Sequence, residues 1–242
     1  MSSSERGGVG DVAVPTQELF VEAWQVYRKM VDNDYLFHRG AYGCLRRVLL
    51  EEFRKPFRFI DVACGDSSMS VKALEGTLVS QYSGLDISEQ ALAIAKDNLK
   101  ALDCAVTFRV GDFAEILQQW EQPAEVVWIG LSLHHLLSPR KLEVMRHVRS
   151  IVGETGRLLI YEDTSPDGES RSGWLARWDA QKTLWTAYDE QEWNYVTLHV
   201  HSSDFPETDS VWRQLGQQAG FSRVKELFES PSKLFRVYSF QA

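Results

Sequence analysis

Cysteine is scarce in this sequence: Cys44, Cys64 and Cys104 are the only three among 242 residues, and they lie far apart. An odd and scattered set favours neither a disulfide framework nor a zinc site, and we expect no metal. There is also no run of about 18 apolar residues, and the N-terminus lacks the apolar stretch of a signal peptide. We therefore expect no membrane span and a cytoplasmic location.

Basic residues are outnumbered by acidic ones. Lys and Arg total 26 against 34 Asp and Glu, which gives a net charge of −8 and a pI of about 5.3. A sequence-independent grip on nucleic acid needs clustered Lys and Arg. We therefore expect a small-molecule substrate rather than a nucleic acid. The composition indicates no particular oligomeric state.

The first half of the chain alternates short apolar runs with helical patterns. Residues 1–14 are polar and small and predict a disordered tail. Residues 15–55 predict an N-terminal helical cap, with helices at 15–31 and about 42–53. Predicted strands follow at 58–62, 80–86, 105–110, 125–130 and 157–161. Predicted helices lie between them at 67–74, 88–102, 113–120 and 139–152. Such alternation is typical of βαβ units that form a mostly parallel sheet covered on both faces.

The alternation of predicted strands and helices ends at about residue 164. Residues 164–206 form an insertion after the fifth strand, which should place it as a lid over the mouth of a site. A helix is predicted at 209–219 and two final strands at 223–228 and 234–240, which can pair as an antiparallel edge. We expect a single α/β domain over 15–242 with a Rossmann-like seven-stranded sheet, N-terminal helices and a helical lid.

The segment FIDVACGDSSMS, residues 59–70, predicts a strand-to-helix turn that holds a ligand. Gly65 permits a left-handed conformation, and Ser67 is a plausible N-cap. The turn lacks the G-x-G-x-x-G pattern of a nicotinamide-binding site. Asp61 and Asp66 are unhelpful to a pyrophosphate but suit a ligand with a cationic amino group.

Two further acids follow the next strands. Asp86 lies 21 residues after Gly65, where a carboxylate accepts hydrogen bonds from ribose hydroxyls. Asp112 ends the third strand and precedes Phe113; these can bind an exocyclic amine and stack on a purine. Each acid alone could be a helix cap, but together they outline an adenosine with an amino acid attached.

These motifs, with GLDIS at 84–88, VGDF at 110–113 and VVWIGLSLHHL at 126–136, make the chain resemble the class I S-adenosylmethionine-dependent methyltransferases over about 58–162. The resemblance implies S-adenosyl-L-methionine as cofactor. It implies that the methionine end lies against Asp61, Ala63 and Gly65. It further implies that the ribose and adenine lie against Asp86, Ile87, Asp112, Phe113 and Leu131.

N-terminal helices often cover the cofactor in resembling proteins. Tyr27, His38 and Arg39 are candidates for this contact, and Arg39 could meet the carboxylate of the cofactor. The alternative is an ordinary amphipathic helix end with a solvated charged face.

Candidate catalytic residues are His134 and His135, which follow the fourth strand, and Glu162, which ends the fifth. A histidine there could act as a base or orient the acceptor. The alternative for the histidines is packing, with His135 the more structural of the two if Leu133 and Leu136 point into the core. The alternative for Glu162 is a solvated loop.

The lid contains four candidate substrate-binding residues, namely Trp174, Trp178, Trp185 and His199. Aromatic side chains could enclose a planar or cationic molecule. The alternative is a helical stripe of tryptophans that packs against the domain.

We therefore expect methyl transfer from S-adenosylmethionine to a small molecule, a metabolite or natural-product intermediate, by in-line displacement. The sequence leaves open whether an oxygen, a nitrogen, a carboxylate or a carbon is methylated. The first alternative is a non-catalytic, cofactor-binding subunit that activates a partner. A nicotinamide-dependent oxidoreductase and an aminopropyl transferase are more distant alternatives.

Overall fold

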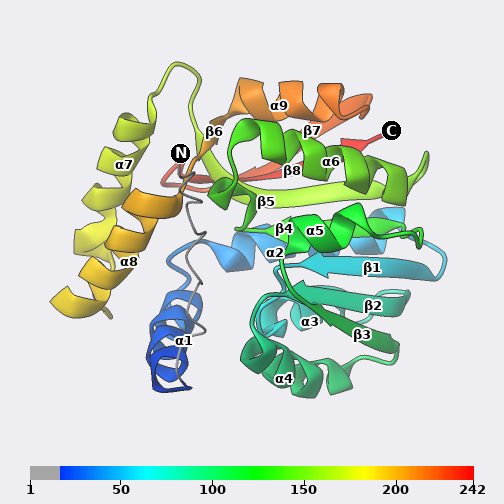
Figure 1. The fold of residues 1–242 in the computed structure, drawn as a ribbon, viewed down its shortest axis with the longest axis horizontal. Coiled ribbons are helices and arrows are strands. Elements are labelled where there is room, and N and C mark those ends of the chain that lie inside the picture. Colours follow the sequence, from blue (N-terminus) through cyan, green and yellow to red (C-terminus); the bar gives the residue numbers. More distant parts are fainter. Residues whose placement is uncertain (1–16) are drawn as a thin grey trace, which may run out of the picture.

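A computed structural model describes residues 17–242, and side chains from Trp24 onward; the predicted tail at 1–14 lies outside the described residues. The strands are β1 (Phe57–Val62), β2 (Val79–Asp86), β3 (Ala105–Val110), β4 (Val126–Gly130), β5 (Arg157–Ser165), β6 (Glu207–Thr208), β7 (Arg223–Glu229) and β8 (Phe235–Gln241). They form a sheet in the order β3-β2-β1-β4-β5-β8-β7, with the short β6 beside β5 (Figure 1).

The sheet is parallel from β3 to β5, and β8 and β7 add an antiparallel edge. The predicted seven-stranded sheet is thus confirmed, with β6 as an addition of two residues. The strand order reverses between β1 and β4, which is where open parallel sheets bind ligands, outside the carboxyl ends of the strands.

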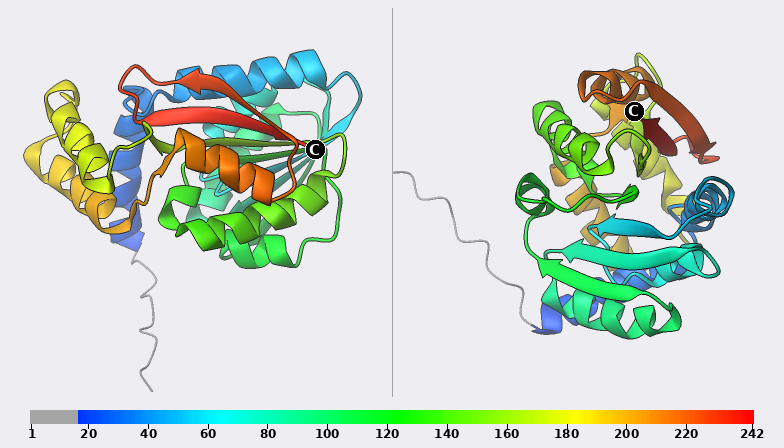
Figure 2. Two further views of the ribbon diagram at one scale, coloured as in Figure 1. Left: turned by 90° about the horizontal axis from the view of Figure 1, so that it is seen from above. Right: turned by 90° about the vertical axis from the view of Figure 1, so that its right-hand side faces the viewer.

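Helices cover both faces of the sheet (Figure 2). They are α1 (Gln17–Asp32), α2 (His38–Glu52), α3 (Ser68–Leu74), α4 (Glu89–Asn98), α5 (Phe113–Gln118), α6 (Ser138–Val152), α7 (Arg171–Asp179), α8 (Glu190–Ser203) and α9 (Asp209–Gln218). Short 3₁₀ turns are η1 (Leu99–Ala101), η2 (Leu133–His135) and η3 (Ala180–Leu184). Within residues 17–242, no helix has the length and apolar character needed to cross a membrane.

Alternate strand residues feed two separate apolar clusters, because successive side chains of a strand point to opposite faces. Phe59 and Trp128 belong to the cluster under α2 and α3, whereas Ile60 and Val127 belong to the cluster under α5, α6 and α9. The near-continuous apolar runs of the inner strands follow from burial on both faces.

Helices α1, α7 and α8 stand together at the end of the sheet where β5 runs into α7 (Figures 1 and 2). Lys29 of α1 pairs with Glu192 of α8 at 2.6 Å. The Tyr188 hydroxyl, between η3 and α8, donates to the Val26 carbonyl of α1 at 2.7 Å. The insertion after β5 is therefore helical, as predicted, and it is tied to the N-terminal helix.

Strand β5 is four residues longer than predicted. Its polar end, from Glu162 to Ser165, is buried. Glu162 and Asp163 continue the pairing with β8, and Thr164 and Ser165 pair with β6. The solvated-loop alternative for Glu162 is therefore wrong, because backbone pairing extends the strand through polar residues.

Two local predictions are also corrected. Helix α2 begins at His38, four residues before the predicted 42, after Phe37 in a left-handed conformation without a side-chain cap. Ser67 precedes α3 but makes no capping hydrogen bond, since its hydroxyl bonds the Tyr82 hydroxyl at 2.8 Å. The Ser68 N–H is instead accepted by the Asp66 carboxylate at 3.0 Å.

Candidate active site

The turn after β1 has an open backbone and a buried acid. Ala63 and Gly65 both have positive φ, and a Cβ added to Gly65 would meet no atom within 4 Å, so a ligand can approach the turn closely. Asp61 is 1% exposed and accepts a hydrogen bond from the Tyr82 hydroxyl at 2.6 Å. Burial raises the pKa of Asp61 to about 6, although hydrogen bonds from Ser70 and Tyr82 lower it.

Asp86 joins the ends of β1 and β2. One carboxylate oxygen accepts from the Gly65 N–H and the other from the Ser88 N–H, both at 2.8 Å. Burial raises its pKa. A carboxylate has about four acceptor positions, so two remain for the hydroxyls of a ribose. Ile87, the next residue, is 76% exposed and presents an apolar side chain beside this carboxylate.

Asp112 acts as a helix cap in the structure. Its carboxylate accepts from the Ala114 N–H at 2.7 Å and the Glu115 N–H at 3.3 Å. Phe113 is half-buried against the cluster under α5. The cap is compatible with a second role, because the other carboxylate oxygen accepts no hydrogen bond from the described residues.

Tyr27 of α1 lies close to the acids of this edge. Burial raises the pKa of its hydroxyl, and the charges of Asp66, Asp61 and Asp86 raise it further. The contact of Tyr27 with the cofactor stays a prediction.

His38 and Arg39 differ in their placement. His38 is buried between Tyr42 and Tyr161, and burial lowers its pKa to about 4, so the ring is neutral. The Arg39 guanidinium donates to the Asp32 carbonyl and lines a cavity of about 420 Å³ between α1, α2 and α3.

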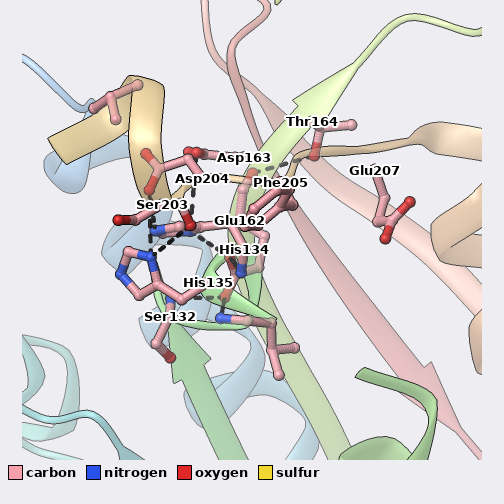
Figure 3. A network of polar contacts seen from close by, with 12 residues as sticks. Ser132, His134, His135, Glu162, Asp163, Thr164, Ser203, Asp204, Phe205 and Glu207 are labelled. Atoms are coloured by element: carbon pink, nitrogen blue, oxygen red, sulfur yellow. Dashed lines mark hydrogen bonds and ion pairs between the residues drawn. The ribbon is translucent and has the colours of Figure 1, made fainter. Parts of the chain in front are cut away.

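A second polar cluster follows β4 (Figure 3). Leu131 has φ 51° and donates its N–H to the Tyr161 carbonyl at 2.7 Å. The Glu162 carboxylate then accepts three backbone N–H groups of the turn, from Ser132, Leu133 and His134, at 2.8–3.1 Å. It also bonds Nδ1 of the His134 ring at 2.8 Å. Glu162 thus organises the whole turn.

The two histidines have the reverse of the expected placement. His134 is 6% exposed, whereas His135 is exposed, so His134 is the more structural member of the pair. Burial lowers the pKa of His134, but Asp163, Glu162 and Asp204 together outweigh burial and raise it to about 9. Burial raises the pKa of Asp163.

The predicted lid tryptophans lie in the core. Trp174, Trp178 and Trp185 are at most 4% exposed. Trp178 stacks on Trp174 at 6.0 Å and on Trp193 at 6.3 Å, and it meets Trp185 edge-on at 5.2 Å. These positions match the alternative of a packed tryptophan stripe. His199 instead lies at the surface beside Asp204.

Two residues of this edge were missed from the sequence. Tyr82 holds Asp61 from inside β2, where it is indistinguishable from an apolar core residue. Asp204 follows α8 and lies beside His134 and His135, 70 positions earlier in the chain. No local pattern marks either residue; only the long-range packing of the insertion brings Asp204 to the turn.

The residues at this edge of the sheet fit the cofactor that the resemblance implies. Buried carboxylates at the ends of β1 and β2 suit an amino group and a ribose, the open turn suits close approach, and exposed Ile87 suits an adenine face. A Rossmann-like sheet with these groups at its carboxyl edge defines the class of S-adenosylmethionine-dependent methyltransferases.

Comparison with known proteins leads to the same class of protein. A family model described as a methyltransferase domain matches residues 54–211, and the chain belongs to this family. A demethylmenaquinone methyltransferase of Leptospira interrogans is 27% identical over 80% of this chain and 78% of its own. A second one, from Bacillus cereus, is 26% identical over 69% of this chain and 70% of its own.

Solved structures share the fold. Magnesium protoporphyrin IX methyltransferase from Synechocystis, with bound S-adenosylhomocysteine, superposes with a TM-score of 0.61 at 14% identity, over 93% of this chain and 95% of its own. An O-methyltransferase family protein from Burkholderia thailandensis gives a TM-score of 0.63 at 18% identity, over 88% of this chain and 59% of its own. The protein is an S-adenosylmethionine-dependent methyltransferase.

Replacing Asp86 by alanine should lower the affinity for S-adenosylhomocysteine at least tenfold, because hydrogen bonds to a charged acceptor contribute about 1.5–3 kcal/mol each. Calorimetric titration measures this. Asp97→Ala, an exposed carboxylate of α4 paired with Lys100, is the matched control and should bind as wild type. Equal affinity in Asp86→Ala would remove this residue from the site.

Cofactor affinity should also depend on pH through Asp61. Below its pKa of about 6 this carboxyl is protonated and loses its attraction for an ammonium group. Affinity for S-adenosylhomocysteine should therefore fall about tenfold between pH 7 and pH 5, since roughly one carboxyl in ten stays ionised one unit below the pKa. In the Asp61→Asn variant this loss of affinity between pH 7 and pH 5 should disappear. A variant that still loses affinity as the wild type does would contradict this role of Asp61.

Proposed function

We propose that this methyltransferase methylates an oxygen atom of a small organic acceptor bound between η2 and α8. The observation that supports this most is the turn held by Glu162, which sets the buried ring of His134 at the same edge of the sheet as Asp61 and Asp86. A polar ring at this point can orient an acceptor hydroxyl toward the transferred group.

The cofactor supplies a methyl group on a positively charged sulfur. Asp61 would bind its amino group, Arg39 its carboxylate and Asp86 its ribose. Ile87, Asp112 and Phe113 would hold the adenine. Leu131, fixed by its bond to the Tyr161 carbonyl, would border the sulfur. Tyr27 would close this side from α1.

On the acceptor side, the packed tryptophans would hold α7 and α8 in place rather than touch the acceptor. His135 and His199 would line the mouth, since both are accessible. The demethylmenaquinone methyltransferases among the relatives support a small organic acceptor. The O-methyltransferase family protein among the structural neighbours supports oxygen as the atom methylated.

The test is transfer of a labelled methyl group from S-adenosylmethionine to panels of phenols, enols, amines and carboxylic acids, with products identified by mass. We expect methyl ethers from one or more hydroxylated acceptors. Label found only on nitrogen or carbon would contradict oxygen transfer. Binding of S-adenosylhomocysteine without transfer to any panel would favour the non-catalytic, partner-activating alternative.

A further inference from the structure

We propose that His134, His135, His199 and Asp204 form a binding site for a divalent transition-metal ion of the zinc type. Three imidazole nitrogens converge on one carboxylate oxygen, Oδ1 of Asp204. The distances are 3.3 Å from Nδ1 of His135, 3.8 Å from Nε2 of His134 and 3.9 Å from Nε2 of His199. The ligand atoms of His134, His135 and Asp204 all lie within 4.8 Å of one another.

The distances to Asp204 Oδ1 are close to the distances between ligands of a tetrahedral site. His134, His135 and Asp204 already form one group, and the exposed His199 stands outside it and would turn in from the surface to complete the set. Ligands about 2.0–2.1 Å from a zinc ion stand roughly 3.4 Å apart. The three nitrogens therefore need to approach Asp204 by at most about half an ångström. Two of the ligands are neighbours in η2 and two flank the C-terminal end of α8, so both halves of the site are held by secondary structure.

The Asp204 carboxylate is a second indication of a ligand, because one of its oxygens is buried without a hydrogen bond. The residue is 4% exposed, and Oδ1 has no hydrogen-bond partner among the described residues. Buried polar atoms are normally hydrogen-bonded, whereas the His134 ring that faces this oxygen stays 3.8 Å away, beyond hydrogen-bond distance. Each of the three histidines turns a ring nitrogen toward this oxygen without the geometry of a hydrogen bond. A metal ion among them would satisfy all four groups together.

The surroundings of His134 resemble the outer shell of a metal site. Its Nδ1 bonds the Glu162 carboxylate at 2.8 Å, which leaves Nε2 toward Asp204. Metal-binding histidines usually donate their other ring N–H to a carboxylate or carbonyl in this way. Nδ1 of His135 also lies 3.3 Å from the Ser203 carbonyl, a contact that metal binding would replace.

Three nitrogens and one oxygen select the type of ion. Imidazole suits zinc, cobalt, nickel and copper, whereas magnesium and calcium prefer oxygen ligands. The His199 side chain is 57% exposed, so one side of the site is open to solvent. If the proposed oxygen transfer holds, an acceptor hydroxyl could add there as a fifth ligand. The ion, and not the His134 ring directly, would then orient the hydroxyl and lower its pKa. Metal binding itself does not depend on that transfer.

The test is a titration of the untagged, chelator-treated protein with cobalt chloride, followed by its visible absorption, and with zinc chloride by calorimetry. We expect one equivalent to bind with micromolar or tighter affinity and to give the strong visible band of cobalt in a four- or five-coordinate site. His199→Ala and Asp204→Asn should each weaken binding at least tenfold. His201→Ala is the matched control on α8, where it pairs with Asp179, and should bind as wild type.

Absence of the cobalt band in the wild-type protein, or unchanged affinity in both His199→Ala and Asp204→Asn, would overturn the proposal. Titration of each sample with S-adenosylhomocysteine keeps the two questions apart. We expect the variants to retain this affinity, so that loss of cobalt alone identifies the metal ligands. Failure of methyl transfer in a protein that still binds cobalt would count against the proposed function and not against the metal site.

Discussion

Replacing Glu162 by glutamine should lower the free energy of unfolding by about 3–5 kcal/mol, the range for breaking a buried charged pair. The carboxylate accepts three backbone N–H groups and the His134 ring. A glutamine presents its NH₂ group to two of these donors, which are then buried without a partner. Urea denaturation measures the loss.

Glu143→Gln is the matched control, because Glu143 forms an exposed pair with Arg140 and should contribute no more than about 1 kcal/mol. A shift in Glu162→Gln as small as that of the control would mean that the turn of His134 holds its shape without this carboxylate. The role of Glu162 as the organiser of the turn would then be wrong.

Replacing Trp178 by alanine should destabilise the protein by about 3–5 kcal/mol, as is usual for a buried tryptophan. Its ring stacks on Trp174 and Trp193 and meets Trp185 and Phe235 edge-on. Because these neighbours surround the Trp178 ring, its loss should lower the denaturation midpoint and leave the KM for an acceptor unchanged. Leu198→Ala on α8, at a side chain 72% exposed, should change stability little.

The opposite pattern would restore the aromatic lid as a substrate-binding surface. A Trp178→Ala variant with nearly wild-type stability and a KM raised tenfold or more would place this ring against the acceptor. Thermal or urea denaturation and steady-state methyl transfer on the same preparation distinguish the two cases.

Much of the fold was predictable because the inner strands are apolar runs of ordinary length. Parallel strands buried on both faces need such runs, and each predicted strand ended at, or within three residues of, an acid or a glycine that marked the next turn. The alternation of strands and helices alone placed Asp61 and Asp86 together at the carboxyl edge of the sheet. Their mutual spacing then indicated an adenosine-type ligand.

The rest depended on contacts between distant segments. Glu162 and Asp163 look like loop residues, yet pairing with β8 draws them into the sheet. The spacing of Trp174 and Trp178 predicted a helical stripe, but only the packing of α7 against α8 and β8 shows which side it faces. Asp204 has no local signal, since its neighbours at the site are the histidines of η2.

We infer that the acidic edge of the sheet binds S-adenosylmethionine. The most direct measurement is a calorimetric titration of the purified protein with S-adenosylhomocysteine, with NADH as the control. We predict one equivalent of S-adenosylhomocysteine bound with micromolar affinity and no binding of NADH. Absence of S-adenosylhomocysteine binding, both alone and with candidate acceptors present, would mean that the acidic edge does not bind this cofactor.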